Sequence, residues 1–273
     1  MQGASRDALK RARESFDASI GALPDGAGSR DVSDGLYAVA ALLDREPSLR
    51  RALTDPASTP ESRRGLVDAL LGEQLTPLPL GVLRELVSDR WSSSADLRTA
   101  VELLAAGAAI NAAEGDGVLD EVEDELFRFG RLLEREQPLR AALTDPGLPV
   151  DRKLSLLREL LGTRAQPITL RLVEVAVTQP RTGSLETSLE ELSRLAAQRR
   201  QRYIAQVRVA RPLEADQEQR LGASLARIYG REVALQVDVD PTVLGGIEVR
   251  VGDEVIDGTV ERRLQSVRRT LAG

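Results

Sequence analysis

Two stretches of this chain are nearly the same fifteen residues. LLDREPSLRRALTDP occupies residues 42–56 and LLEREQPLRAALTDP occupies residues 132–146, at an offset of 90 residues. Eleven of the fifteen positions are identical, where composition alone would give roughly one, and self-similarity at a fixed spacing is typical of a structural repeat. The register of the match continues to Gly72 and Gly162. The sequence therefore predicts a tandem duplication.

The repeated unit is predicted to be helical. Apolar residues make up 42% of the chain but aromatic residues only 3%, so the core must be built mainly from Leu, Val and Ala. Leucines recur at helical spacing in both copies. Thr59, Pro60 and Glu61 form a favourable helix start, with a cap, a proline at the first helical position and an acid in the first turn. The expected helices cover about residues 5–20, 32–46, 59–71, 80–91, 97–113, 119–133 and 184–201.

The last seventy residues follow a different pattern. Apolar residues alternate with polar ones at 205–209, 233–239 and 247–251, which predicts three half-buried strands. A helix is expected at 215–229, between the first two strands. This crossover makes those two strands parallel if they are neighbours.

A chain reversal is expected between the second and third strands. Pro241 fixes its own φ, while Gly245 and Gly246 take positive φ at low cost, so this link predicts an antiparallel hairpin. A final helix should begin at Asp257 or Thr259 and place one apolar face inward, made by Val260, Leu264, Val267 and Leu271. The predicted fold class is α+β and mostly α: two helical bundles, residues 1–112 and 113–201, and a β-α-β-β-α domain, residues 202–273.

The composition excludes several kinds of chemistry. The chain has no Cys and no His, so zinc sites of Cys and His, thiol chemistry and Ser-His catalysis are absent from it. Its formal net charge is −6, which gives no basic field and argues against nucleic acid as a partner. Its start lacks the apolar core of a signal peptide, and its apolar stretches are too short to span a bilayer. We therefore expect an intracellular protein without direct membrane insertion.

No group of residues predicts an active site. The acidic run at 120–125 is threaded by apolar residues at helical spacing, so we interpret it as a solvated helix face instead of a metal or acid–base cluster. Asp240, Asp253 and Asp257 lie near glycines and could suggest a cation site, but turn and cap roles explain each of them. We therefore expect no catalytic residue, no metal and no cofactor.

The C-terminal stretch carries a family resemblance. From Asp240 to Val260 the sequence reads D-P-x-x-L-G-G-I-x-V-x-x-G-D-x-V-I-D-G-T-V, which resembles the signature of the δ subunit of F-type ATP synthases, the family of the mitochondrial oligomycin-sensitivity-conferring protein. Gly258-Thr259 departs mildly from the usual D-x-S. The matching signature residues are Asp240, Pro241, Gly245, Gly246, Gly252, Asp253 and Asp257.

The helical part resembles the same family. The N-terminal module of that family is a bundle of about six helices with an L-x-D/N-P turn. This chain has the turn twice, at residues 53–56 and 143–146. The second copy leads directly into the C-terminal domain, so the first copy is the extra one, as in the long actinobacterial form. Because 90 residues is shorter than a whole family bundle, one helix near 95–113 is expected to serve both copies.

The resemblance implies a non-catalytic role in the peripheral stalk, which stops the catalytic head from turning with the rotor. It implies that the helical module holds N-terminal segments of the α subunits, that the C-terminal domain meets the b subunit, and that each complex has one copy. It also implies a place at the cytoplasmic face of the bacterial plasma membrane. A helical-repeat adaptor of another assembly is the competing class, and an enzyme working with carboxylates and arginines is a third.

Four apolar residues are candidates for contact with a partner helix. Phe16 and Ile20 lie on the first expected helix, and Val82 and Leu86 lie on the helix expected at 80–91. Helix-in-groove recognition needs apolar anchors of this size between charged rims. The alternative is that these four residues belong to the core, and their exposure in the structure separates the two interpretations.

Overall fold

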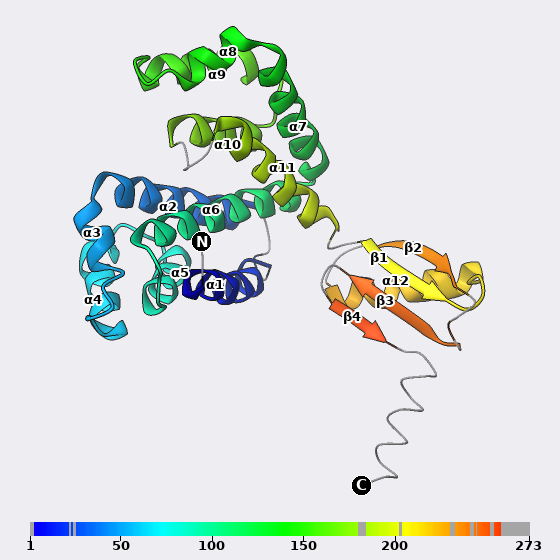
Figure 1. Ribbon diagram of the computed structural model, residues 1–273. Coiled ribbons are helices and arrows are strands. Elements are labelled where there is room, and N and C mark those ends of the chain that lie inside the picture. Colours follow the sequence, from blue (N-terminus) through cyan, green and yellow to red (C-terminus); the bar gives the residue numbers. More distant parts are fainter. Residues whose placement is uncertain are drawn as a thin grey trace. The chain divides into compact units, whose positions relative to one another are not determined.

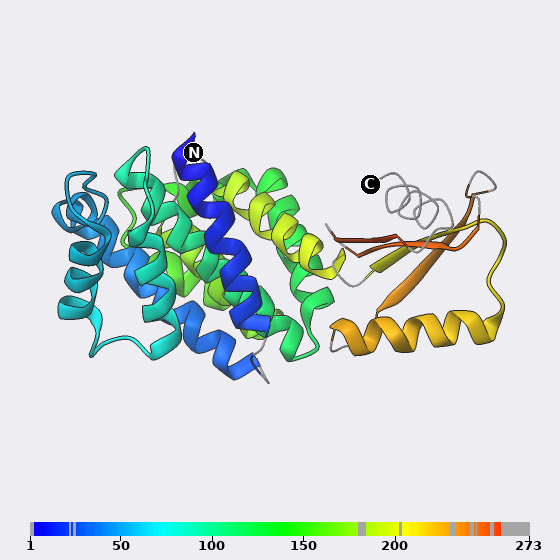
Figure 2. The same cartoon turned by 90° about the horizontal axis from the view of Figure 1, so that it is seen from below.

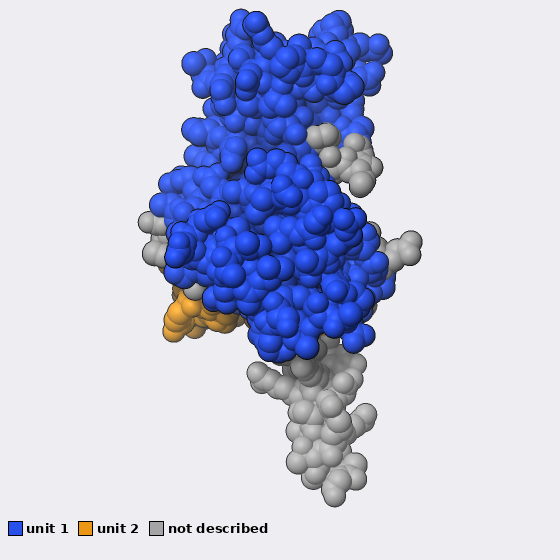
Figure 3. Space-filling view, turned by 90° about the vertical axis from the view of Figure 1, so that its left-hand side faces the viewer, with its two compact units in different colours: residues 1–196 blue, residues 197–273 orange. Residues whose placement is uncertain are grey.

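The computed structural model describes residues 3–21, 23, 26–179, 184–201, 204–229, 233–240, 243, 245–251 and 254–257. Contacts divide the chain into a helical unit, Met1–Ala196, and a C-terminal unit, Ala197–Gly273 (Figure 3). The expected final helix, including Val260, Leu264, Val267 and Leu271, lies outside the described residues.

The helical unit is built from two successive sets of helices (Figure 1). Their bounds are α1 (Ala4–Gly21), α2 (Gly26–Arg45), α3 (Pro47–Ala52), α4 (Pro60–Leu71), α5 (Pro77–Ser88), α6 (Ser94–Gly115), α7 (Leu119–Arg135), α8 (Gln137–Thr144), α9 (Val150–Leu161), α10 (Pro167–Thr178) and α11 (Leu185–Gln201). An offset of 90 residues converts the bounds of α4 and α5 into those of α9 and α10. By the same offset α2, α3 and α6 correspond to α7, α8 and α11, and α1 corresponds to α6.

The repeated L-T-D-P motif forms the same turn in both copies. The hydroxyl groups of Thr54 and Thr144 donate to the carbonyl four residues earlier, at 2.9 and 2.8 Å. The carboxylates of Asp55 and Asp145 accept from the backbone N–H two residues later, at 2.9 and 2.8 Å. Threonine thus binds the end of the short helix while aspartate closes an Asx turn, which stops the helix and reverses the chain.

Helix α6 serves both copies, as the spacing of the repeat predicts. It packs against α1, α2, α3 and α5 of the first copy and against α7 and α10 of the second. A helix between two layers must be apolar or small nearly all round, and α6 meets this requirement with an alanine-rich middle, residues 105–109. Its buried residues are Leu97, Arg98, Ala100, Val101, Glu102, Leu103, Leu104, Ala105, Ala106, Ala108, Ala109, Ile110, Asn111, Ala112 and Ala113.

Its counterpart α1 is buried on one face only. The buried residues follow a helical spacing from Ser5 through Ala8, Ala12 and Phe16 to Ile20, and the charged residues between them face outward. Figure 2 shows α1 lying across the outside of the helical unit. The first copy therefore begins with a partly exposed helix at the place where the second copy has the buried helix α6.

The C-terminal unit is a small sheet with one helix. Its elements are β1 (Ile204–Val209), α12 (Ala215–Tyr229), β2 (Ala234–Val239), β3 (Ile247–Val251) and β4 (Glu254–Asp257), and the strand order is β2-β1-β3-β4. The expected order of strand, helix, strand and strand is confirmed, and β1 pairs with β2 in parallel. The separate core of this unit consists of Ala205, Val207, Val209, Leu225, Val233, Val249 and Val251.

The predicted hairpin of the second and third strands is wrong. Strands β2 and β3 run in opposite directions, but β1 lies between them and pairs with β3. Neighbouring strands are about 4.8 Å apart, so a link that passes over one strand must bridge about 10 Å. The link at 240–246 is long enough to do so, and Gly245 and Gly246 turn it with φ of 110° and 87°. The actual hairpin joins β3 to β4, a strand that the sequence pattern missed.

Candidate functional site

The four predicted partner-contact residues lie in the core of the helical unit. The exposed fractions of Phe16, Ile20, Val82 and Leu86 are 3%, 1%, 6% and 0%. These values favour the core interpretation for the side chains themselves. A role in partner binding stays a prediction, and the surface available to a partner is formed by the residues beside them.

A groove of about 450 Å³ lies between α1 and α5, the helices that carry these four residues, with Arg64 of α4 at its edge. Its lining residues are Arg11, Ala12, Ser15, Arg64, Arg84, Glu85, Ser88 and Asp89. Two pairs join the helices across it: Arg11 donates to Asp89 at 2.7 Å and Ser15 donates to Glu85 at 3.2 Å. The hydrogen bond to Asp89 raises the pKa of Arg11, which stays charged. The groove is therefore shallow, with charged and hydroxyl groups along it and an accessible lining that is more apolar than polar.

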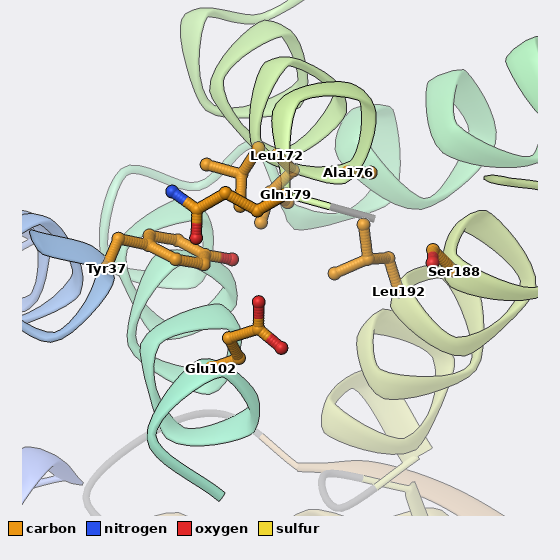
Figure 4. A pocket seen from close by; sticks show the side chains of 8 residues that line it. Tyr37, Glu102, Leu172, Ala176, Gln179, Ser188 and Leu192 are labelled. Atoms are coloured by element: carbon orange, nitrogen blue, oxygen red, sulfur yellow. The ribbon is translucent and has the colours of Figure 1, made fainter. Parts of the chain in front are cut away.

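The junction of the equivalent helices of the second copy, α6 and α10, is covered by α2 together with α11. Figure 4 shows the ring of Tyr37 from α2 reaching between Glu102 of α6 and Leu172 of α10. The cavity left at this junction measures about 10 Å³. A void of this size has room for one water molecule at most. The first copy is thus open where the second is filled.

A second hollow, of about 390 Å³, lies among α8, α9, α10 and the start of α11. Leu143, Val177 and Leu185 supply apolar walls, and the charged side chains of Arg140 and Lys153 also line it. Ala176 lies where the first copy has Leu86, so the smaller side chain leaves space here.

The two copies also differ at one buried cation. Lys153 corresponds to Arg63, whose guanidinium donates to the carbonyls of Asp55 and Ser88 at 3.0 and 3.2 Å. Both side chains are buried. Arg63 thereby ties the L-T-D-P turn to the end of α5, a connection that a lysine, with one point donor group, does not reproduce.

The acidic run at 120–125 is a helix face for most of its length, but Glu125 has a structural role that its sequence did not reveal. Its carboxylate accepts from the backbone N–H of Gln166 at 2.9 Å and from the hydroxyl of Thr169 at 2.5 Å. It thereby caps the start of α10 from a different helix. Within the described residues no three His, Cys, Asp or Glu side chains are arranged to hold a metal ion.

The signature residues that the structure describes lie in or beside the sheet. Asp240 donates its backbone N–H to the Val209 carbonyl at 2.9 Å, and its carboxylate accepts from Arg208 at 2.5 Å. Arg208 also pairs with Glu248 on β3 at 3.2 Å, so this arginine of β1 joins the start of the link at 240–246 to β3. Pro241, Gly252 and Asp253 lie outside the described residues, and Asp257 ends β4.

Comparison with known proteins gives a consistent result. Residues 105–271 match the family model "ATP synthase delta (OSCP) subunit". The chain is 51% identical to "ATP synthase subunit delta" of Parafrankia sp. (strain EAN1pec), over 99% of this chain and 99% of that protein. It is 51% identical to the protein of the same name in Streptomyces griseus, over the full length of both. It is 52% identical to that of Streptomyces coelicolor, over 100% of this chain and 98% of that one.

A chain in a solved structure of the Toxoplasma gondii mitochondrial ATP synthase hexamer is 24% identical and matches 62% of this chain and 95% of its own. Its TM-score is 0.35, too low an overlap to add to the sequence matches. In the part of the chain that the structure describes, no helix combines the length and the apolar character needed to cross a membrane.

Proposed function

Because the chain belongs to the ATP synthase delta (OSCP) subunit family, the non-catalytic peripheral-stalk component of F-type ATP synthase, we propose that it connects the α subunits to the b subunit. The helical unit holds N-terminal segments of α, and the C-terminal unit binds b. One copy serves each complex, at the cytoplasmic face of the bacterial plasma membrane. Because the chain belongs to this family, we set aside the alternative hypothesis of a helical-repeat adaptor in another assembly.

The observation that carries the α contact is the open face of α1 and α5. Two helices lie side by side there, with a groove between them and charged residues along both edges. An amphipathic helix binds such a groove through small or apolar contacts along its floor and ion pairs along its rim. Arg11, Arg84, Glu85 and Asp89 supply both signs of charge for that rim.

The contact with b is supported by exposed apolar side chains in the C-terminal unit. Val255 and Ile256 on β4 and Val239 on β2 are all substantially exposed, and these strands form the two edges of the sheet. Edge strands with exposed apolar residues are surfaces that another chain can cover.

We also propose that the three segments 1–112, 113–201 and 202–273 are the functional modules of the chain. The first copy adds docking surface and rigidity to the link, and α6, which runs across the boundary at 112, joins the two copies. A shared helix transmits force between them without a flexible linker.

The test measures binding of the full-length chain to two synthetic peptides, the N-terminal segment of α and the C-terminal segment of b. Both should bind. Ser15→Trp places a bulky side chain in the groove between α1 and α5 and should weaken α binding by about tenfold, while b binding stays unchanged and serves as the internal control. If the unmodified chain has no affinity for the α peptide, the proposed α contact is wrong.

A further inference from the structure

The first and second copies contain equivalent pairs of helices, α1 with α5 and α6 with α10, and the first pair is exposed where the second is covered. We infer that α2 occupies, on α6 and α10, the position that a partner helix takes on α1 and α5. The helical unit then offers one docking face in place of two, and the extra first copy provides it. This inference rests on the proposed function, because it names which of two equivalent faces receives the α segment.

The equivalence of the two faces follows from the repeat. An offset of 90 residues relates α1 to α6 and α5 to α10. Both pairs pack side by side. Three residues that line the groove, Ala12, Glu85 and Asp89, correspond to Glu102, Val175 and Gln179. All three of these line the small cavity beside Tyr37 (Figure 4). Positions that form the groove in the first copy thus lie beside α2 in the second.

Helix α2 follows α6 along its whole length in the opposite direction. Near one end, the side-chain amide of Asn111 donates to the Ser29 hydroxyl at 2.8 Å, and both groups are buried. Near the other end, Arg98 forms an ion pair with Asp44 at 3.2 Å. Small residues on both helices allow this close approach: a Cβ added to Gly26 would lie 2.8 Å from the Ala112 carbonyl oxygen.

Helix α2 also contacts α10. Arg171 of α10 pairs with Asp34 of α2 at 3.2 Å, and its guanidinium carbon lies 6.0 Å from the centre of the Tyr37 ring. Tyr37 itself is buried. Helix α2, 20 residues long, thus packs closely on α6 and reaches α10 through the side chains of Asp34 and Tyr37. A helix docked beside a pair of helices makes contacts of this kind.

The corresponding positions of the first copy are open. Gly81 lies where α10 has Arg171, and a Cβ added there would meet no atom within 4 Å. The middle of α1 carries Ser15 and Asp17 where α6 has Ala105 and Gly107, so its outer face is polar. The occupant that fits is an amphipathic helix of about the length of α2, with polar groups for the rim, which we assign to the α N-terminal segment.

The experiment is a calorimetric titration of the full-length chain with a 20-residue peptide from the N-terminus of α, a length that matches α2. The inference predicts one peptide per chain. Gly81→Trp on the open face should weaken binding by about tenfold. The matched change on the covered face, Arg171→Trp, should leave affinity within about twofold. Gly81→Ala, which adds a small side chain to the same helix, reports any effect of the backbone alone.

A second experiment fixes α2 to α10 with a chemical cross-link. The chain has no cysteine, so Asp34→Cys with Arg171→Cys can be joined by a short bismaleimide, and peptide binding should be unchanged. Two peptides per chain, a loss of binding on cross-linking, or weakening by Arg171→Trp equal to that by Gly81→Trp each overturn the inference and leave the proposed α contact intact. If no peptide binds the unmodified chain, the proposed contact fails and the inference falls with it.

Discussion

Asn111 of α6 and Ser29 of α2, two residues 82 positions apart in the chain, form a buried side-chain hydrogen bond of 2.8 Å. Buried polar groups are costly unless they are paired, so this bond favours one alignment of α2 on α6. Asn111→Ala should lower the free energy of unfolding by about 1–3 kcal/mol. Chemical denaturation measures it, and Thr99→Ala, at a half-buried position of the same helix, is the control. Equal stability of the two variants would contradict this role.

Gly26 permits the close contact between the start of α2 and the end of α6. An added Cβ would lie 2.8 Å from the carbonyl oxygen of Ala112, closer than real Cβ atoms approach such an atom. Gly26→Ala should therefore destabilise the helical unit by about 1–3 kcal/mol. The matched change Gly65→Ala adds the same methyl group to α4 in open space and should stabilise by about 0.5–1 kcal/mol. Thermal unfolding of both variants compares them, and the same sign for both would refute the packing argument.

Glu125 supports the start of α10 from α7. Loss of a carboxylate that accepts from a helix N-terminus costs about 0.5–2 kcal/mol, so Glu125→Ala should destabilise the chain by that amount. Glu121→Ala changes an exposed residue of the same acidic run and should have little effect. Urea unfolding measures the loss of stability in both variants. Equal losses would mean that the negative charge of the acidic run, and not the cap on α10, is responsible.

Tyr229 makes the stability of the C-terminal unit depend on pH in the alkaline range. Burial, together with a hydrogen bond of 2.8 Å to Glu254, raises its pKa from 10.0 to about 12. The folded chain keeps this proton between pH 10 and about 12, while the unfolded chain releases it. The stabilising contribution is therefore complete below pH 10 and is lost as pH rises towards 12.

Ultraviolet titration of tyrosinate, taken as the difference between the unmodified chain and Tyr229→Phe, measures this pKa directly. The difference spectrum should titrate near 12 in the folded chain and near 10 in urea. A folded-state value equal to the urea value would show that neither burial nor Glu254 acts on this hydroxyl.

Much of the fold could be predicted because the repeat imposes it. The match of residues 42–56 to 132–146 predicted two related helix sets, and the short spacing of the copies predicted a shared helix near 95–113, which is α6. The alternation of Val and Ala predicted the strands of the C-terminal unit. These features are local or periodic, so a sequence carries them directly.

The pairing of strands was harder to predict, because it depends on distant contacts. Gly245 and Gly246 indicate a turn, but they do not say whether the chain returns beside β2 or passes over β1. Strand β4 is four residues long, too short for a clear alternating pattern.

The candidate site was predicted only in part. Helices α1 and α5 were identified, but the residues chosen on them were large and apolar, and such residues are buried. The exposed groove is lined by Arg11, Ser15 and Glu85, which have the composition of any solvated helix face. That α2 covers the second copy depends on the placement of Tyr37 between two helices, which no local pattern encodes.

The most direct test of the account is a cryo-electron microscopy structure of the complete ATP synthase that contains this chain. The account predicts helical density from one α N-terminus along α1 and α5, with α2 still packed on α6 and α10. Density from α on α6 and α10, with α2 displaced, would contradict it, as would an α1–α5 face that remains bare in the assembled complex.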